Sequence, residues 1–307
     1  MSIETATNAL IAEFRARPTP RAGSLIITVF GDAIAPRGGT VWLGSLIRVL
    51  ADFGISERLV RTSVFRLSRD DWLLGRQVGR RSYYSLTDGG AQRFEQATHR
   101  IYGEPRQTWS GDWCLVLLAG LDGERKESVR RELAWLGFGA MSTNVLAHPA
   151  PDIVELETLL KRLGVHEALV VMQGSTLGPT QDRAMRELVR KSWNLDDIDT
   201  RYAAFVDQFR PVFRAVQKAP PRDPRRAFQI RMLLIQEYRK ILLRDPLLPA
   251  ELLPTTWHGT PAYRLCRNLY RKIYAAADGF MSEELETAEG PLPPPAPDFY
   301  HRFGGLR

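Results

Sequence analysis

The chain has 307 residues, 44% of them hydrophobic and 25% charged, a composition typical of globular proteins with two or three packed domains. Lysine and arginine outnumber the acidic residues by seven, which favours a polyanionic partner, although a membrane surface or an acidic ligand would fit the same excess. No apolar run approaches the ~20 residues that cross a bilayer and the N-terminus lacks a signal-peptide core, so we expect a cytoplasmic protein.

The N-terminal third begins with residues 1–23, which we expect to form a flexible arm after a possible short helix. The arm ends in RARPTPRAG, where two prolines and three arginines disfavour regular structure. The elements expected next are, in chain order, a helix over 24–30, a loop over 31–39, a short strand over 40–42 and a helix over 45–52.

An arginine-rich helix is expected from Glu57 to about Asp70, because the Ser56 side chain can accept a hydrogen bond from the first unpaired backbone N–H groups. Val60, Val64 and Leu67 fall on one stripe of this helix, and the arginines fall on the other side. A β-hairpin should follow, with strands over 72–76 and 81–86, a turn over 77–80 and a final helix over 87–102.

The order helix, strand, helix, helix, hairpin is that of a winged helix-turn-helix, here over residues 24–103. Between Glu57 and Arg81 the chain carries seven arginines against three acids, more than half of its net positive charge. An arginine fork can bind a guanine edge or a phosphate, and a helix fits the major groove. We therefore predict DNA binding; the alternative is a solvated surface helix with incidental arginines.

Residues 104–179 alternate strand, helix, strand, helix, strand, which predicts a small ferredoxin-like α+β module. The apolar runs WCLVLLA and EALVVMQ indicate buried strands. Residues 180–281 show helical periodicity and are expected to form a helical domain for effector binding and dimerisation, with candidate interface faces over 201–217 and 227–243. Residues 282–307 are acidic and then proline-rich, so we expect an extended or disordered tail.

Three segments of this chain resemble the PaaX family of bacterial repressors of phenylacetate catabolism. They are GRQVGRRSYYSLTDGG, WSGDWCLVLL and EYRKILLRDPLLPAELLP, and the last is the most specific. The likeness runs from about Ser24 to Phe280. It implies a homodimeric repressor that stays on operator DNA until phenylacetyl-CoA binds, and a middle module similar to the small CRISPR-adaptation nuclease.

By position, the resemblance places the recognition helix over 57–70 and the wing over 76–84. The residues expected to touch bases or nearby backbone are Arg58, Arg61, Thr62 and Arg66, and those expected to touch phosphates or the minor groove are Arg76, Arg80 and Arg81. Phe65 lies on the exposed side, where packing against the wing is favoured over contact with a thymine methyl group.

An acyl-CoA effector needs cations for its phosphates and an apolar slot for its acyl group. The candidates for this site are Arg239, Lys240, Arg244, Trp257 and Tyr263, with Arg222, Arg225, Arg226 and Tyr270 as further options. Surface charge and helix-packing aromatics would explain each of these residues equally well. No resident cofactor is expected.

The competing hypothesis from another class is a metal-dependent nuclease that uses Asp122, just after the first strand of the middle module. One carboxylate does not make a two-metal site, and the five histidines show no metal-binding spacing. We therefore expect no catalytic residue, no metal and no enzymatic activity. A regulator of another catabolic operon with a different effector is the second alternative. Cys114 and Cys266 have no CxxC partner and are expected to be buried free thiols.

Overall fold

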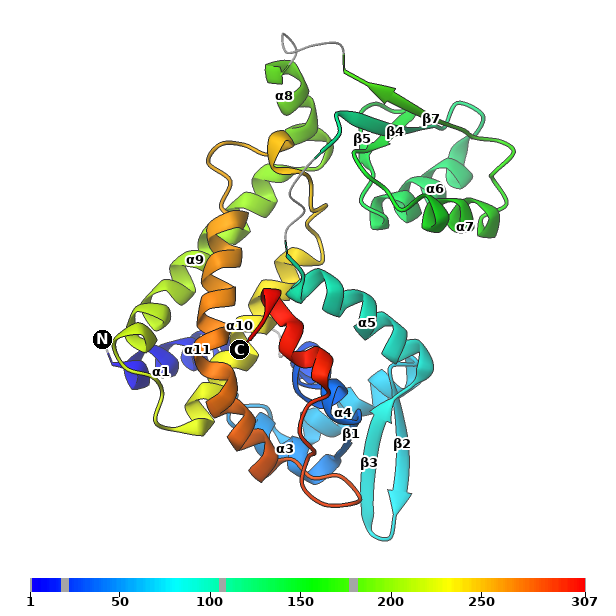
Figure 1. Ribbon diagram of the computed structural model, residues 1–307. Coiled ribbons are helices and arrows are strands. Elements are labelled where there is room, and N and C mark those ends of the chain that lie inside the picture. The colour runs from blue at the N-terminus through cyan, green and yellow to red at the C-terminus, as the bar shows by residue number, and fades with distance from the viewer. Residues whose placement is uncertain (1, 18–21, 105–108, 177–181, 307) are drawn as a thin grey trace. The chain divides into compact units, whose positions relative to one another are not determined.

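The computed structural model describes residues 2–17, 22–104, 109–176 and 182–306, and the chain divides into two compact units (Figure 1). Unit 1 comprises residues 1–104, 202–243 and 259–307, and unit 2 comprises residues 105–201 and 244–258. The chain thus enters unit 2 twice and returns to unit 1 each time. Within the described ranges, no helix has both the length and the apolar character needed to span a membrane.

The first part of unit 1 is a winged helix, as predicted. Its three strands form an antiparallel sheet in the order β1-β3-β2, and the β2–β3 hairpin projects from the body of the unit (Figure 1). The elements are α2 (Ala22–Val29), the π-helix Phe30–Ile34, the 3₁₀ turn Ala35–Arg37, β1 (Thr40–Trp42), α3 (Leu43–Ala51), α4 (Glu57–Arg69), β2 (Leu73–Val78), β3 (Arg81–Leu86) and α5 (Asp88–Tyr102).

Helix α4 starts where its cap predicts, since the Ser56 Oγ accepts a hydrogen bond from the Leu59 backbone N–H at 3.4 Å. Its apolar stripe, with Val60 and Val64, is fully buried. The second wing strand has the predicted bounds, whereas the first extends to Val78, so the turn between them shrinks to two residues. Gly79 opens this turn at φ 59°, a left-handed conformation that glycine adopts without strain.

The prediction of a loop over 31–39 is wrong except at Gly38 and Gly39. Residues 30–34 form a π-helix and residues 35–37 a 3₁₀ turn. Asp32 and Arg37 are both about 1% exposed, because they bind partners far away in the sequence. Single π-turns of this kind are rare and often occur at functional positions.

The possible short helix at the start of the expected arm is present as α1 (Ile3–Arg15), a packed helix of 13 residues, so this part of residues 1–23 is not a flexible arm. The helix is capped by Ser2 and packs on α10, and its Phe14 ring meets Phe53 edge-on at 6.2 Å between centroids. The burial of Leu10 and Phe14 explains why this segment does not behave as an arm. Residues 18–21 of the predicted arm lie outside the described residues.

Residues 195–284 contain three long helices: α9 (Leu195–Lys218), α10 (Pro224–Leu242) and α11 (Gly259–Glu284). We expected residues 180–281 to form a separate helical domain. Instead, α10 and α11 pack on each other and on the winged helix within unit 1. Almost every residue of α10 from Ala227 to Gln236 is buried, so this helix is the axis of the unit.

The prediction of an extended or disordered C-terminal tail is wrong. After α11 the chain returns to the winged helix, and it ends in the 3₁₀ segment Pro297–Gly304. Leu285 and Phe303 are fully buried, and the Trp42 backbone N–H donates to the Glu286 carbonyl at 2.7 Å. The tail is therefore part of the core of unit 1.

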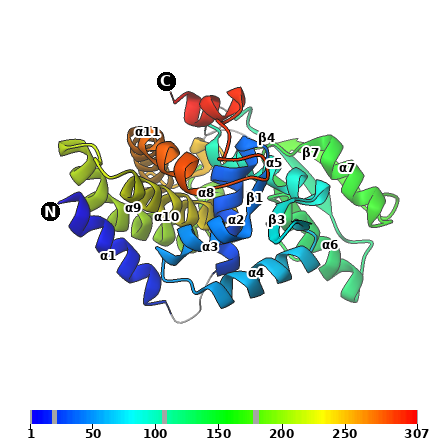
Figure 2. The same ribbon diagram turned by 90° about the horizontal axis from the view of Figure 1, so that it is seen from below.

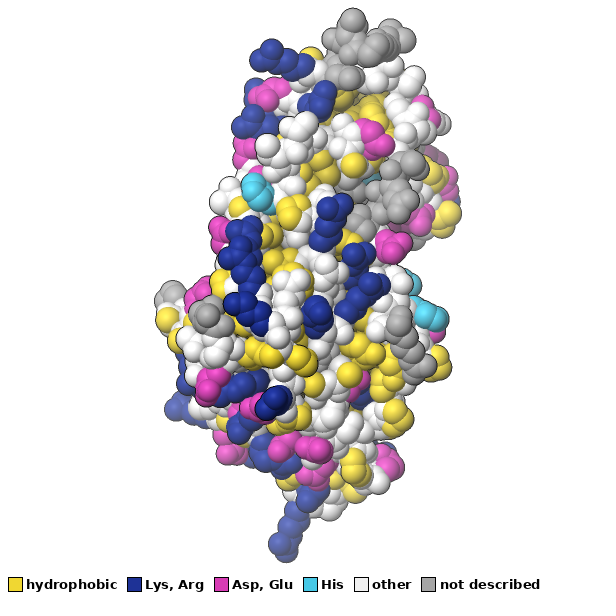
Figure 3. Space-filling view, turned by 60° about the vertical axis from the view of Figure 1, so that its left-hand side comes forward, with side chains coloured by type: hydrophobic (Ala, Val, Ile, Leu, Met, Phe, Trp, Pro, Cys, Tyr) yellow, Lys and Arg dark blue, Asp and Glu magenta, His cyan; other side chains and the backbone are white. Residues whose placement is uncertain are grey.

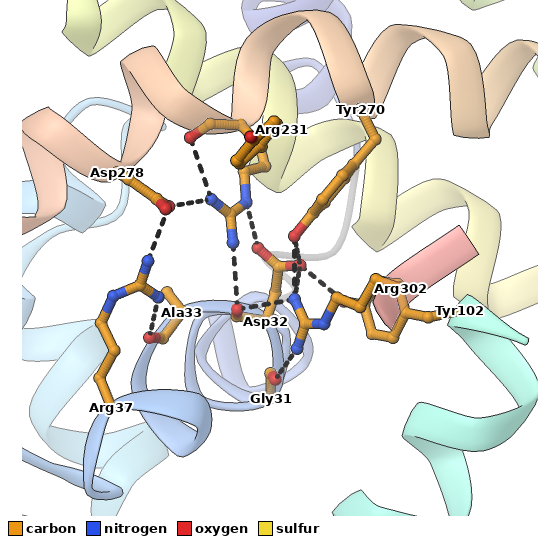
Figure 4. Close-up of polar contacts among 10 residues, drawn as sticks. Gly31, Asp32, Ala33, Arg37, Tyr102, Arg231, Tyr270, Asp278 and Arg302 are labelled. Carbon is orange, nitrogen blue, oxygen red and sulfur yellow. Dashed lines mark hydrogen bonds and ion pairs between the residues drawn. The ribbon is translucent and has the colours of Figure 1, made fainter. Parts of the chain in front are cut away.

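A buried charge network joins these segments at the centre of unit 1 (Figure 4). Asp32 on the π-helix accepts from Arg231 Nε of α10 at 2.6 Å and from Arg302 Nη1 of the tail at 2.9 Å. The hydroxyl groups of Tyr102 on α5 and Tyr270 on α11 donate to the same carboxylate at 2.6 and 2.9 Å. One carboxylate thus binds groups from four other segments.

The network extends to Asp278 on α11. Its Oδ1 accepts from Arg231 Nη1 at 2.5 Å and lies 2.7 Å from Arg37 Nη2. Burial alone would raise the pKa of Asp32, but the two arginine charges and the Tyr102 hydrogen bond outweigh it and hold that pKa below its ordinary value.

Unit 2 contains the predicted ferredoxin-like module, whose antiparallel sheet has the strand order β5-β6-β4-β7. Cys114, Val116 and Leu133 belong to its core. The elements are β4 (Asp112–Leu117), α6 (Gly123–Trp135), β5 (Gly139–Ala140), β6 (Val145–His148), α7 (Ile153–Arg162) and β7 (Val170–Ser175), followed by α8 (Asp182–Ser192) and the later 3₁₀ turn Ala250–Leu252.

Two details of this module differ from the prediction. The second strand of the predicted alternation, expected over residues 138–145, is replaced by the two-residue β5 (Gly139–Ala140) and by β6 (Val145–His148), which pair with each other. The last strand, expected to be buried, is an edge strand on which Val170, Val171 and Met172 are 43–56% exposed. The apolar run alone did not distinguish a central strand from an edge strand.

The two cysteines are free and buried, as predicted. Burial raises the pKa of both thiols, most strongly that of Cys266. Both therefore remain protonated and unreactive at neutral pH.

Replacing the central carboxylate should destabilise the protein strongly. We expect Asp32→Ala to lower the free energy of unfolding by about 3–5 kcal/mol, because two buried guanidinium groups lose their counterion. Urea denaturation checks this, with Asp298→Ala as the control: Asp298 is a 98% exposed side chain of the tail, and its loss should change stability by less than ~0.5 kcal/mol.

The loss of unfolding free energy caused by Asp32→Ala should depend on pH in a defined direction. Because the folded pKa of Asp32 is lowered, its stabilisation is complete above the unfolded value of about 3.9 and is lost as the pH falls through the folded value. The difference between wild type and Asp32→Ala should therefore be constant near neutrality and shrink below pH ~4. Equal stability of the Asp32 and Asp298 variants at pH 7 would contradict the assigned role.

Candidate nucleic-acid interface

The outer side of α4 carries the residues predicted to read DNA. Arg58, Arg61, Thr62 and Arg66 are all exposed, and Figure 2 shows α4 at the periphery of unit 1 with its outer side uncovered by other elements of that unit. The burial of the opposite, apolar stripe holds this side outward. The helix therefore presents a cationic surface on a rigid support.

The arginines of α4 differ in their present partners. The Arg61 guanidinium donates to Glu57 Oε1 at 2.7 Å, one helical turn earlier, and both side chains are largely exposed. Such exposed pairs contribute little and exchange partners at low cost. The Arg58 and Arg66 guanidinium groups form no hydrogen bond or ion pair with any described residue, and the Thr62 hydroxyl donates to the Arg58 carbonyl.

The wing presents a second set of cations. Arg76 and Arg80 are exposed, and neither side chain pairs with another residue in the described ranges. Arg81 differs, because its Nη1 lies 2.8 Å from Glu286 of the C-terminal segment and its guanidinium carbon 4.1 Å from the centroid of the Trp42 ring. Arg81 directly follows the turn at the tip of the wing, where it is held half-exposed beside a carboxylate.

We expected the Phe65 ring to pack against the wing. Instead, it is 68% exposed on the outer side of α4. Leu74 and Val78 of the wing are also exposed, by 60% and 43%. An apolar ring among cations is costly to leave in water and is suited to contact with a partner.

The base of the wing is fixed by the start of α5. The Thr87 Oγ1 accepts from the Gly90 N–H as the helix cap, and it donates to the Asp71 carbonyl at 2.9 Å. Arg93 donates to the same carbonyl at 3.1 Å and lies over the Trp72 ring. Any movement of α5 is therefore transmitted to the point at which the wing leaves the body.

Positive charge is not confined to the winged helix. Figure 3 shows Lys and Arg side chains gathered in the middle of another face, and α11 alone exposes Arg264, Arg271 and Lys272. What distinguishes the winged helix is the combination of unpaired guanidinium groups with a helix and a hairpin that can enter the grooves of a duplex.

The nuclease hypothesis gains no support from the described residues. Asp122 occupies the N-cap position of α6 without a capping hydrogen bond from its side chain. Over the part of the chain that the structure describes, no group of three or more His, Cys, Asp or Glu side chains could hold a metal ion.

Comparison with known proteins decides the family. Models of one family match three consecutive parts of the chain: the PaaX-like protein model matches residues 21–90, the PaaX protein central Cas2-like domain 106–186 and the PaaX-like protein C-terminal domain 193–283. The chain is also 40% identical to the transcriptional repressor PaaX of Escherichia coli K12 over 284 residues, 92% of this chain and 90% of the relative.

The chain belongs to the PaaX family. It is a PaaX-like transcriptional repressor, and the expectation that it is no enzyme agrees with the name of this relative. The Cas2-like description of the central domain agrees with the ferredoxin-like topology of unit 2.

A solved structure supports the fold. The uncharacterized protein Rv0674 from Mycobacterium tuberculosis matches 84% of this chain and 97% of its own length, with a TM-score of 0.56 and 21% sequence identity. At that identity the likeness concerns the fold alone. The arrangement of elements is thus shared with a chain of low sequence identity.

The residues proposed from the PaaX resemblance for an effector are divided between the two units. Arg239, Lys240 and Tyr263 lie in unit 1, whereas Arg244 and Trp257 lie in unit 2. Lys240 binds Glu237 at 2.9 Å. Tyr263 is buried on α11 with its ring centroid 6.0 Å from that of Phe303.

Three of the further effector candidates already bind other residues of unit 1. Arg225 binds the buried Asp52 side chain, with Nε 2.7 Å from Oδ2, and Arg226 binds Glu4 at 2.6 Å. Tyr270 belongs to the Asp32 network. Arg225 and Arg226 line a pocket together with Asp52 and Asp223, whereas Arg239 lines a smaller cavity with mostly apolar walls.

Sequence reasoning missed the Asp32 network and the apolar cavity. GDAIAPRGG has the composition of a loop, so nothing marked Asp32 as buried. Phe94 and Ile101 of α5 line the cavity with Ile235 and Arg239 of α10, which lie more than 130 residues away in the sequence.

Proposed function

We propose that this protein represses phenylacetate degradation genes by binding operator DNA through α4 and the wing, and that phenylacetyl-CoA releases it. The observation that carries the DNA-binding part is the set of four exposed guanidinium groups, on α4 and the wing, without a partner among the described residues: Arg58, Arg66, Arg76 and Arg80. Exposed cations held on a rigid helix and hairpin are what binding to a duplex requires.

The two elements have different tasks in this proposal. Arg58, Arg61, Thr62 and Arg66 enter the major groove on α4, where an arginine fork binds the O6 and N7 atoms of guanine. Arg76 and Arg80 of the wing bind phosphates, which position the protein without reading sequence. Arg81 joins them by exchanging Glu286 for a phosphate oxygen.

Identity of 40% with a transcriptional repressor supports the repressor function. Phenylacetate catabolism as the regulated process is what the resemblance of the sequence to the PaaX family implies. We further propose a cytoplasmic homodimer. Two-fold symmetric repressors bind two half-sites about one helical turn apart, and a symmetric dimer would present two copies of α4 to such an operator.

A gel shift on the DNA upstream of the phenylacetate degradation genes tests the proposal. We expect one specific complex that disappears when phenylacetyl-CoA is added, because the ligand must favour the arrangement that does not bind DNA. Free coenzyme A is the control and should leave the complex intact. A complex insensitive to phenylacetyl-CoA but released by another acyl-CoA would indicate a different operon and effector; absence of any complex would refute DNA repression.

Single substitutions separate base reading from phosphate binding. We expect Arg66→Ala to weaken operator binding by about 1–3 kcal/mol and to reduce discrimination against altered operators. Arg80→Ala should weaken binding to all duplexes and lower the slope of log K against log salt by about one unit. Titrations at several salt concentrations measure both.

Arg162→Ala is the matched control for these substitutions, because Arg162 is an exposed arginine of unit 2 that pairs with Glu132 at 2.8 Å. It should leave affinity and salt slope unchanged. If Arg66→Ala and Arg80→Ala behaved like this control, α4 and the wing would not be the interface.

A further inference from the structure

A small cavity of about 70 Å³ lies inside unit 1. The end of α2 and the π-helix, α5 and α10 enclose it, and Trp72 at the start of the wing closes one side. Its apolar walls include Ile27, Phe94, Ile101 and Ile235. The cavity is therefore next to both the DNA-binding head and the helices that carry it.

Two arginines, Arg93 and Arg239, line this cavity. Arg239 is held in place by hydrogen bonds to neutral groups. Its Nε donates to the Thr28 Oγ1 at 2.7 Å, and its Nη2 donates to the Ser24 carbonyl and Oγ at 2.8 and 2.9 Å. Burial lowers the pKa of this guanidinium. No carboxylate of the described residues forms an ion pair with it.

A partly buried guanidinium without a counterion is unusual, because desolvating a charge is costly unless a charged or strongly polar partner offsets it. The other buried arginines of unit 1 follow this rule: Arg37, Arg231 and Arg302 all bind carboxylates. Arg239 is the exception among them. An oxygen acceptor from a ligand would complete its coordination.

The cavity volume limits what can enter. About 70 Å³ exceeds the ~10–15 Å³ that one water needs but is well below the ~300–1,000 Å³ of pockets that enclose whole drug-sized ligands. Only the apolar end of a ligand therefore fits, with its carbonyl or carboxylate oxygen at Arg239 and any larger group outside.

The walls connect the cavity to the wing. The Trp72 and Phe94 rings meet edge-on at 5.6 Å between centroids, and both line the cavity. The Trp72 carbonyl accepts from the Thr87 N–H at 3.2 Å, and Leu73, the next residue, begins β2. A group that displaces either ring therefore acts on the base of the wing.

We infer that this cavity is the effector site: it takes the acyl end of a small apolar acid or acyl thioester, whose carbonyl oxygen accepts from Arg239. The inference rests on the proposed function. Entry of the acyl group displaces the Phe94 and Trp72 rings and with them the start of α5. The wing then leaves the orientation that binds phosphates, and the ligand binds this released arrangement more tightly.

The test fills the cavity without changing the DNA-binding surface. Ala97 on α5 lines the cavity, and Ala97→Leu places a larger apolar side chain in it. Ala91→Leu is the matched control, because Ala91 lies on the same helix, is exposed and does not line the cavity. Calorimetry measures phenylacetyl-CoA, phenylacetate and coenzyme A with each full-length protein, and gel shifts measure operator binding.

We expect wild type and Ala91→Leu to bind phenylacetyl-CoA, phenylacetate or both, and coenzyme A not to bind. Ala97→Leu should bind the same ligand at least about tenfold more weakly, a loss of ~1.4 kcal/mol, and should still bind operator. Binding of phenylacetate alone identifies a free acid as the source, and binding of the thioester alone identifies the acyl-CoA. Ligand affinity in Ala97→Leu equal to that of wild type would overturn the site.

A second variant tests the oxygen contact. Arg239→Met removes the guanidinium but leaves Ser24, Thr28 and Gln236 bonded to one another. It should weaken ligand binding by about tenfold or more while operator binding persists; unchanged ligand affinity would refute the role of Arg239. If wild type binds operator but none of the three probes, the cavity proposal fails and the repressor stands. If it binds no operator, the proposed function fails.

Discussion

The structure of unit 1 depends on one buried carboxylate. Asp32 is fully enclosed, and it is stable as an anion only because Arg231 and Arg302 bind it from two other segments of the chain. Removing either the anion or its cations would leave charge in a medium that cannot solvate it. The π-helix, α10, α11, α5 and the C-terminal segment therefore fold together or not at all.

Because of this constraint, the winged helix is bound to later segments of the chain. A winged helix is commonly an independent module. Here, however, its π-helix supplies Asp32 to the network, and Asp52, directly after α3, binds Arg225 of α10. The C-terminal segment adds Glu286, which binds Arg48 and Arg81 of the head at 3.0 and 2.8 Å. Residues more than 200 positions away thus hold the head in its orientation. A ligand bound against α10 can for that reason affect the wing.

Local signals explain which parts of the fold were predictable. The Ser56 cap, the stripe of Val60 and Val64 and the strong hairpin pattern each act within a few residues, so α4 and the wing were predicted nearly to their ends. The segment around Asp32 and the tail around Arg302 have loop-like composition, and each is ordered by the other at a separation of 270 residues. No pattern in a single sequence reveals such a pair.

The same reasoning applies to the candidate sites. The exposed arginines of α4 follow from periodicity, because the apolar stripe fixes which side faces solvent. Arg239 was a candidate only as one of several cations, and its distinction, a half-buried charge without a carboxylate, appears only when α2 and α10 are brought together. Arg231 belongs to the same helix, but it is fully buried and its guanidinium binds the carboxylates of Asp32 and Asp278.

The most direct test of this account is the urea denaturation of a fragment that contains only residues 22–104, monitored by circular dichroism. Because Asp32 would then lack Arg231 and Arg302, the account predicts no cooperative unfolding transition for the fragment, in contrast to the full chain. A fragment that unfolds cooperatively and binds operator with the affinity of the full chain would contradict the claim that the buried network makes the head part of one folding unit.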